Sequence, residues 1–307
     1  MNDATTIQDI QDKIIAHIEK EFAIRSVAVQ IPPQGMTSSV FFIKAFDGGE
    51  YAVKYGRDAM KDVPALELIA KKHVSVPVPK LFGSFRLEEL PIVVMERMRF
   101  PLLESVPVGE MSRYVPLMIM NLKKLHAITS AVPGLLSEPE SKKTWKEMML
   151  AIFHDGEFDW DEVSNRDGLD RDLIRISVKK IREKINRTLF EDGEYSFLHT
   201  DFNQRNLFVD PDSDRITGII DWEEAMFGDP MYDFARVRMY LWHFDLGERA
   251  IKDYYDLLDF TPKQKELEDL YWLSRVIQYL GWYSEELNEF NKGRIKLHQD
   301  YLRIYHW

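Results

Sequence analysis

The stretch that decides the fold reads HTDFNQRN at residues 199–206, and IIDW follows it at residues 219–222. The first part has the spacing H-x-D-x-x-x-x-N, and the second is an apolar strand that ends in an acid. Transfer of a phosphoryl group from ATP needs a carboxylate beside the acceptor hydroxyl, and an Asn and an Asp that hold magnesium on the triphosphate. Asp201, Asn206 and Asp221 have the residue types and the order for these three roles. The alternative is an acidic loop in which Asp and Asn serve only as turn residues.

The residues between Asn206 and Asp221 predict a β-hairpin. Residues 207–209 read as a short strand, DPDSD at residues 210–214 is a turn by composition, and residues 215–220 run back as the second strand. Because a hairpin brings the outer ends of its strands together, we expect Asp221 to lie beside Asn206.

These segments, together with the run EEAMFGDPMYDFA at residues 223–235, resemble the aminoglycoside phosphotransferase family, whose fold is similar to that of protein kinases. The resemblance implies an α+β, protein-kinase-like two-lobed fold, with a small antiparallel-sheet N-terminal lobe and a larger, mainly helical C-terminal lobe. Residues 1–98 would form the nucleotide-binding lobe, with a hinge at about residues 95–100. Residues 101–307 would form the catalytic and substrate-binding lobe.

The same resemblance implies an ATP-dependent O-phosphotransferase that uses Mg²⁺, with GTP as an alternative donor. Its acceptor would be a hydroxyl of an aminoglycoside-type antibiotic, and a hygromycin B-like molecule is one candidate. A metabolite kinase of the same fold, acting on choline, homoserine, methylthioribose, a macrolide or a fructosamine, is a second interpretation. The third is a nucleotide-binding pseudoenzyme, but the sequence keeps every residue type that the reaction needs.

The composition sets outer limits on the function. The chain has 307 residues, 45% of them hydrophobic, and no cysteine, which excludes disulfides and thiolate chemistry. A net charge of −11 disfavours nucleic acid and suits a small cationic substrate. No apolar run reaches the roughly 20 residues that a membrane span needs. We therefore expect a cytoplasmic protein with no membrane or nucleic-acid partner, as a monomer or a dimer.

The strand YAVK at residues 51–54 predicts one side of the nucleotide site. Alternation places Ala52 and Lys54 on the same face, which suits a flat adenine and a phosphate. This strand resembles the V-A-I-K element of kinases, so Lys54 is the expected ATP lysine. Such a lysine needs a carboxylate from the next helix. We expect Glu67, the only interior acid of that helix, and Asp62 at the helix start is the competitor.

The rest of the nucleotide site is expected from the resemblance. Met95 would lie at the back of the adenine pocket, and the backbone of Glu96 and Met98 would bond to the adenine. Ser38 and Ser39, at the end of the loop before residue 40, would donate to the phosphates.

Four acids are expected to bind the acceptor substrate. Glu223 and Glu224 follow Asp221 directly, while Asp155 and Glu157 belong to an acidic and aromatic insert. Carboxylates and ring faces would suit the ammonium groups and sugar rings of an aminoglycoside. The alternative for the insert is a solvated acidic loop. Two further polar residues, His126 and Asp233, are expected to be structural supports of the catalytic loop.

Overall fold

The computed structural model describes residues 7–32, 38–140, 143–154, 156, 158–190 and 193–305. Its contacts divide the chain into two compact units. Unit 1 comprises residues 1–103 and 206–224, and unit 2 comprises residues 104–205 and 225–307. The α+β fold class is confirmed, because a sheet dominates the first unit and helices dominate the second.

Unit 1 is built on a five-stranded antiparallel sheet with the strand order β1-β2-β3-β5-β4. The strands are β1 (Ser26–Gln30), β2 (Ser39–Ala45), β3 (Glu50–Tyr55), β4 (Leu81–Leu87) and β5 (Leu90–Glu96). The turn between β2 and β3 contains Gly48 at a φ of +88°, where a glycine avoids the strain of a side chain.

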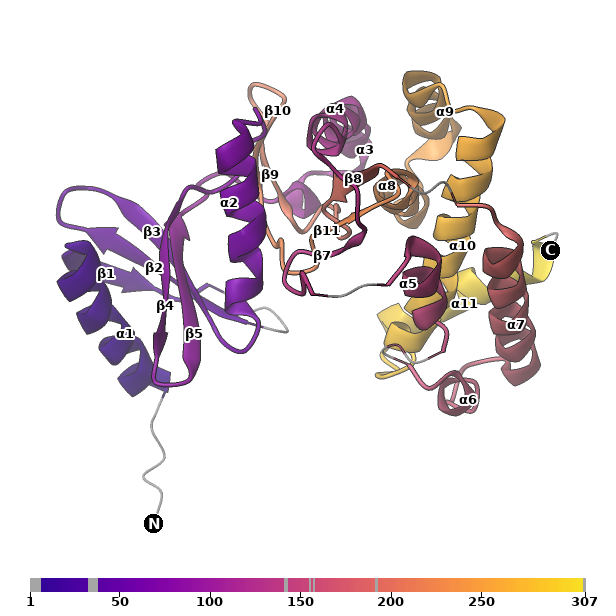
Figure 1. Cartoon of the computed structure of the whole chain (residues 1–307), viewed down its shortest axis with the longest axis horizontal. Coiled ribbons are helices and arrows are strands. Elements are labelled where there is room, and N and C mark those ends of the chain that lie inside the picture. Colours follow the sequence, from indigo (N-terminus) through magenta and orange to yellow (C-terminus); the bar gives the residue numbers. More distant parts are fainter. Residues whose placement is uncertain are drawn as a thin grey trace, which may run out of the picture. The chain divides into compact units, whose positions relative to one another are not determined.

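Two helices pack on the opposite faces of this sheet, as Figure 1 shows. Helix α1 (Ile7–Phe22) buries Ile14 and Ile18 against the face that carries Val53. Helix α2 (Val63–Lys72) begins beside the other face, which carries Ala52. The alternation predicted for β3 is therefore confirmed, and its α2 face is the one that holds Lys54.

The predicted hairpin is also confirmed, and it belongs to unit 1. Strand β9 (Leu207–Asp210) pairs with β10 (Arg215–Ile219) in antiparallel register. Further hydrogen bonds join the hairpin to earlier parts of unit 1, from the Val209 N–H to Pro101 and from the Ile219 N–H to Pro77. These bonds explain why residues 206–224 group with the N-terminal segment, whereas the sequence predicted a single boundary near residues 95–100.

Unit 2 is mainly helical and contains a small four-stranded sheet with the order β6-β8-β11-β7. The short strands are β6 (Thr129–Ser130), β7 (Gly134–Leu135), β8 (Tyr195–Leu198) and β11 (Met226–Gly228). The helices are α3 (Val108–Met111), α4 (Val115–His126), α5 (Trp145–Ala151), α6 (Trp160–Val163), α7 (Arg171–Arg187), α8 (Met231–His243), α9 (Gly247–Leu258), α10 (Pro262–Tyr283) and α11 (Glu289–Ile304). Short 3-10 turns cover residues 59–62, 103–105 and 112–114.

Helix α10 forms the centre of unit 2, where it packs on α7, α8 and α11 (Figure 1). It begins with a capping box in which Thr261 and Gln264 satisfy each other's backbone N–H groups. Among the described residues, no helix is both long and apolar enough to cross a membrane.

Candidate functional site

Several candidate functional residues of unit 1 gather around Lys54 on β3. Its Nζ lies 2.8 Å from Oδ2 of Asp62, 3.1 Å from Oδ1 of Asp221 and 3.5 Å from Oε2 of Glu223. Lys54 and Asp62 are buried, whereas the Asp221 side chain is 37% exposed. One cation therefore faces three carboxylates. The group of four side chains has a net negative charge, and Asp221 is its most exposed member.

Burial by itself would lower the pKa of Lys54. The three carboxylates outweigh that effect and raise its pKa above the ordinary value, so the lysine stays charged. Burial also raises the pKa of Asp62, and the charge of Lys54 opposes this rise. The other oxygen of Asp62, Oδ1, accepts a hydrogen bond of 2.8 Å from the Trp222 N–H. Asp62 therefore links β3, which carries Lys54, to the segment that carries Asp221.

The prediction that Glu67 is the partner of Lys54 is wrong, because Asp62 takes that place. Glu67 lies in the exposed part of α2. Asp62 ends the 3-10 turn before this helix, and its carboxylate makes no cap hydrogen bond to the helix. Because successive helical residues rotate by about 100°, an acid five positions along the helix points to a different side. Only the placement of the helix against the sheet decides between the two acids.

The hairpin brings Asn206 and Asp221 together as predicted. Asn206 precedes β9 and Asp221 follows β10, and the Ile220 N–H donates to the Asn206 carbonyl at 3.0 Å. Asp221 has a φ of +68°, a left-handed conformation that is rare for a residue with a side chain and that is enriched at functional sites. No cluster of three His, Cys, Asp or Glu side chains with metal-binding geometry occurs among the described residues. Two protein oxygens from this pair suit Mg²⁺, which keeps water and substrate phosphates as its other ligands.

The residues expected around adenine lie on the α2 face of the sheet or at the end of β5. Ala52 and Met95 are opposite each other on β3 and β5, and both pack with Ala59 and Val93. The Glu96 N–H is already bonded to the Lys80 carbonyl at 2.8 Å. Within the described part of the chain, no backbone acceptor is found for the Met98 N–H.

The two serines differ in their surroundings. Ser39 belongs to β2 and pairs with Tyr55 of β3. The Oγ atom of Ser38, one residue earlier, is buried and has no hydrogen-bond partner among the described residues. A buried hydroxyl without a partner is costly, which fits a place where a ligand group completes the contact.

In unit 2, the candidate catalytic carboxylate is Asp201, which follows β8. Its Oδ1 accepts a 2.6 Å hydrogen bond from Nη2 of Arg236 on α8. Burial lowers the pKa of Arg236, and the charge of Asp201 opposes this shift. Arg236 also lies over the ring of Tyr279, 5.2 Å from its centre. Arg236 could not be predicted from the sequence, because one arginine between apolar helical residues carries no signal of its own.

The backbone of the loop before Asp201 is fixed by Asp233. The two carboxylate oxygens of Asp233, which is fully buried, accept from the N–H groups of His199 at 3.0 Å and Thr200 at 2.7 Å. His126 Nε2 contacts the same carboxylate at 3.0 Å. Thr200 has a φ of +69°. The structural roles expected for His126 and Asp233 are therefore confirmed, since they hold a strained turn in place.

A partly exposed aromatic group adjoins Arg236. Tyr279 stacks on Tyr283 with 5.3 Å between the ring centres, and His243 packs edge-on against Tyr279. His243 also contacts His298 through their Nε2 atoms at 2.9 Å, and Nδ1 of His298 lies 2.9 Å from the Val276 carbonyl. Burial lowers the pKa of His243 to about 2 and that of His298 to about 4, so both rings are neutral near pH 7.

The acids expected to bind the acceptor have different surroundings. Glu223 faces Lys54, as described above. Glu224 is exposed. Asp155 and Glu157 lie outside the described residues. Two described acids of the insert have structural partners, since Asp159 caps α6 and Asp161 lies 3.6 Å from Arg175.

Comparison with known proteins agrees with this geometry. The sequence model described as the phosphotransferase enzyme family matches residues 28–267, which include all the residues gathered around Lys54 and Asp201. The chain belongs to this family. Among curated relatives of this phosphotransferase, Hygromycin-B 4-O-kinase of Escherichia coli is 32% identical over 95 residues. That match covers 31% of this chain and 26% of the relative.

Solved structures of aminoglycoside phosphotransferases share the fold of this phosphotransferase. A thermostable mutant of APH(4)-Ia, in a ternary complex with AMP-PNP and hygromycin B, matches with a TM-score of 0.72 and 17% identity, over 94% of this chain and 97% of that one. Spectinomycin phosphotransferase APH(9)-Ia, in complex with ADP and spectinomycin, matches with a TM-score of 0.64 and 15% identity, over 95% and 93%. The predicted kinase-like fold is therefore confirmed.

Proposed function

We propose that this phosphotransferase transfers the γ-phosphate of ATP to a hydroxyl group of an aminoglycoside-type antibiotic, with a hygromycin B-like molecule as the leading acceptor. The observation that carries the proposal is the group formed by Lys54, Asp62 and Asp221, beside which the hairpin places Asn206. Phosphoryl transfer depends on a lysine held by a carboxylate and on an Asn and Asp that bind metal.

The proposal assigns nucleotide binding to unit 1. Lys54 would hold the phosphates, and Ser38 and Ser39 would donate to them from the start of β2. Ala52 and Met95 would flank the adenine, with the Glu96 carbonyl and the Met98 N–H as its backbone partners. Asn206 and Asp221 would hold Mg²⁺, and Glu223 would contribute negative charge beside Lys54. When bound, Mg²⁺ neutralises charge on the triphosphate. ATP is the proposed donor, and GTP is the alternative.

Activation of the acceptor is assigned to unit 2. Asp201 would accept or orient the proton of the acceptor hydroxyl, as the Asp of a kinase catalytic loop does. Arg236 fixes one of its oxygens, and Asp233 fixes the backbone on which it stands. A catalytic carboxylate held in this way loses little freedom when the acceptor binds.

Three observations support a cationic sugar as the acceptor. The chain carries a net charge of −11, which raises the local concentration of a polycation. Tyr279 and Tyr283 offer partly exposed rings next to Arg236, and ring faces suit both sugar rings and ammonium groups. A stretch of 95 residues is 32% identical to an enzyme named for hygromycin B. Glu224, Asp155 and Glu157 remain proposed substrate contacts, and the cytoplasm, where ATP is available, is the proposed location.

The test is release of ADP from MgATP, measured by a coupled assay against hygromycin B, other aminoglycosides, choline, homoserine and a macrolide. We expect turnover with at least one aminoglycoside, and mass spectrometry would then locate the phosphorylated hydroxyl. Activity with a metabolite only would refute the antibiotic acceptor and leave the kinase chemistry. Binding of MgATP without turnover of any acceptor would favour a pseudoenzyme.

A further inference from the structure

Two histidines of unit 2 hydrogen-bond to each other in a way that fixes where their protons lie. His298 on α11 is fully buried, and its Nδ1 lies 2.9 Å from the Val276 carbonyl. Because a carbonyl only accepts, this Nδ1 carries the proton, and Nε2 of the neutral ring is then an acceptor. Nε2 of His243, on α8, lies 2.9 Å from that acceptor and must donate to it. In a neutral His243 ring, Nδ1 is therefore left without a proton.

The surroundings of His243 keep its ring neutral. Burial is the largest of the causes that lower its pKa to about 2, and the neighbouring His298 and the charges of Arg294, Arg236 and Arg205 add to it. The ring is nevertheless partly exposed. Within the described part of the chain, no hydrogen-bond partner is found for its Nδ1. His243 thus offers an uncharged hydrogen-bond acceptor whose protonation is fixed by the fold.

His243 adjoins the proposed catalytic carboxylate. It is seven positions after Arg236 on α8, which is close to two helical turns, so both residues lie on the same side of the helix. Arg236 binds Asp201 and lies over the ring of Tyr279, and His243 packs edge-on against that same ring with 5.3 Å between the ring centres. The charge of Arg205, in the loop that follows Asp201, also acts on His243. The unprotonated nitrogen therefore belongs to the surroundings of Asp201.

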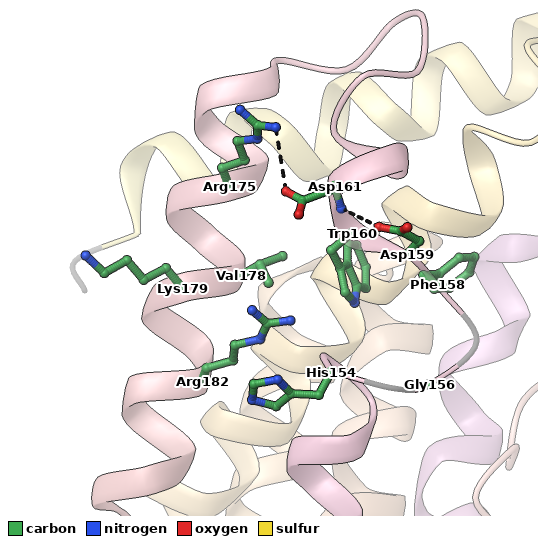
Figure 2. A pocket seen from close by; sticks show the side chains of 10 residues that line it. All are labelled: His154, Gly156, Phe158, Asp159, Trp160, Asp161, Arg175, Val178, Lys179 and Arg182. Atoms are coloured by element: carbon green, nitrogen blue, oxygen red, sulfur yellow. Dashed lines mark hydrogen bonds and ion pairs between the residues drawn. The ribbon is translucent and has the colours of Figure 1, made fainter.

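The tyrosines beside His243 are held in place from behind. Tyr279 and Tyr283, one turn apart on α10, stack with 5.3 Å between their ring centres. Tyr279 also packs edge-on against Trp282 at 5.1 Å, and Trp282 packs against Phe158 at 5.8 Å. Figure 2 shows Phe158 beside Trp160, and their ring centres are 5.4 Å apart. Rings that are supported in this way lose little conformational freedom when a ligand packs on them.

We propose that His243 is a specificity residue of the acceptor site, and that its Nδ1 accepts a hydrogen bond from a hydroxyl or ammonium group of a ring that packs on Tyr279 and Tyr283. This inference rests on the proposed function and names one contact of the acceptor within it. A few fixed polar atoms beside apolar ring faces orient a small molecule, and an amino sugar presents donors at its edges. His298 is then a positioning residue, because it sets the protonation of His243.

Two substitutions separate the acceptor atom from the contact with His298. The side-chain amide of Gln reaches about as far as Nε2 of histidine, so His243→Gln keeps the contact with His298 and removes the acceptor at Nδ1. The amide of Asn ends near the position of Nδ1, so His243→Asn keeps an acceptor there and loses the contact with His298. His73→Gln is the matched control, since it makes the same change at an exposed position of unit 1.

The test is steady-state kinetics with MgATP and hygromycin B, or with another aminoglycoside if the parent phosphorylates that one better. We expect His243→Gln to raise the KM for the acceptor by about tenfold and to leave kcat within about twofold, because the lost hydrogen bond acts in binding. His243→Asn should raise this KM by about threefold at most. His73→Gln should not change it, and the Kd for Mg·AMP-PNP should match the parent value in all three variants.

The order of the two variants decides the outcome. If His243→Asn raises the KM more than His243→Gln does, the histidine pair is only structural and the inference is overturned. An unchanged KM in His243→Gln, or a fall in kcat alone, overturns it as well, and each of these results leaves the proposed function intact. A parent that phosphorylates no aminoglycoside refutes the proposed function and the inference together. If circular dichroism shows that His243→Asn does not fold, the KM of His243→Gln against that of His73→Gln gives the answer.

Discussion

Asp62→Asn removes one negative charge from the group around Lys54 and keeps the size of the side chain. The remaining amide oxygen can still accept the hydrogen bond from the Trp222 N–H. What is lost is the 2.8 Å ion pair between Lys54 and Asp62, both of which are buried. The substitution therefore tests the partner that the structure assigns to the lysine.

The expected loss of stability follows from this geometry. At 2.8 Å and an effective dielectric constant of about 20, the attraction between two unit charges is about 6 kcal/mol. Part of it is offset, because a neutral Asn costs less to bury than a carboxylate. Breaking a buried pair costs about 3–5 kcal/mol. Because Asp221 and Glu223 remain within 3.5 Å of Lys54, we expect the lower end, about 3 kcal/mol.

Nucleotide binding should weaken as well. Without Asp62, Lys54 has only Asp221 and Glu223 as partners, and these two then compete with the phosphates for its charge. We expect the Kd for Mg·AMP-PNP to rise by about tenfold, which corresponds to about 1.4 kcal/mol.

The measurements are urea unfolding followed by circular dichroism and titration calorimetry with Mg·AMP-PNP. Glu67→Gln is the matched control, because it makes the same type of change at an exposed position of α2. Its free energy of unfolding should stay within about 0.5 kcal/mol of the parent value. The reasoning fails if Asp62→Asn behaves like this control, or if Glu67→Gln has the larger effect on the nucleotide.

Four further outcomes are expected. Asp201→Ala should lower kcat by about 10²–10⁴-fold with little change in the Kd for nucleotide, and a folded variant that no longer binds nucleotide would contradict its role. Asp221→Ala should abolish Mg²⁺-dependent nucleotide binding in calorimetry, so an unchanged affinity would argue against metal binding. Arg236→Met should lower kcat by about tenfold or more with a KM near the parent value, because it frees the Asp201 carboxylate, and a change in KM alone would count against this positioning. The pKa of His298 is about 4 in the folded chain, compared with 6.5 for an ordinary histidine. The unfolded state therefore binds the proton more readily, and the stability of the fold falls as the pH drops from 6.5 toward 4. His298→Asn should flatten this decline by about 1.4 kcal/mol per pH unit in urea unfolding at several pH values, and an equal slope in both proteins would refute the assignment.

Much of the candidate site could be predicted because its determinants are local. The hairpin that joins Asn206 to Asp221 is encoded by two short strands and the turn between them, within sixteen residues of chain. The shared face of Ala52 and Lys54 follows from the two-residue period of a strand. The kinase-like fold followed from the resemblance of residues 195–240, where motif and spacing were both present.

The sequence by itself determined which residue types carry the chemistry, their order and the strand and turn patterns that present them. Only the tertiary structure decided their partners. It paired Lys54 with Asp62 instead of Glu67, and it paired Asp201 with Arg236. The physical reason is that periodicity and turn chemistry act over a few residues. The side of a helix that meets its neighbour, in contrast, depends on how distant segments pack, and a rotation of one residue changes which side chain makes the contact.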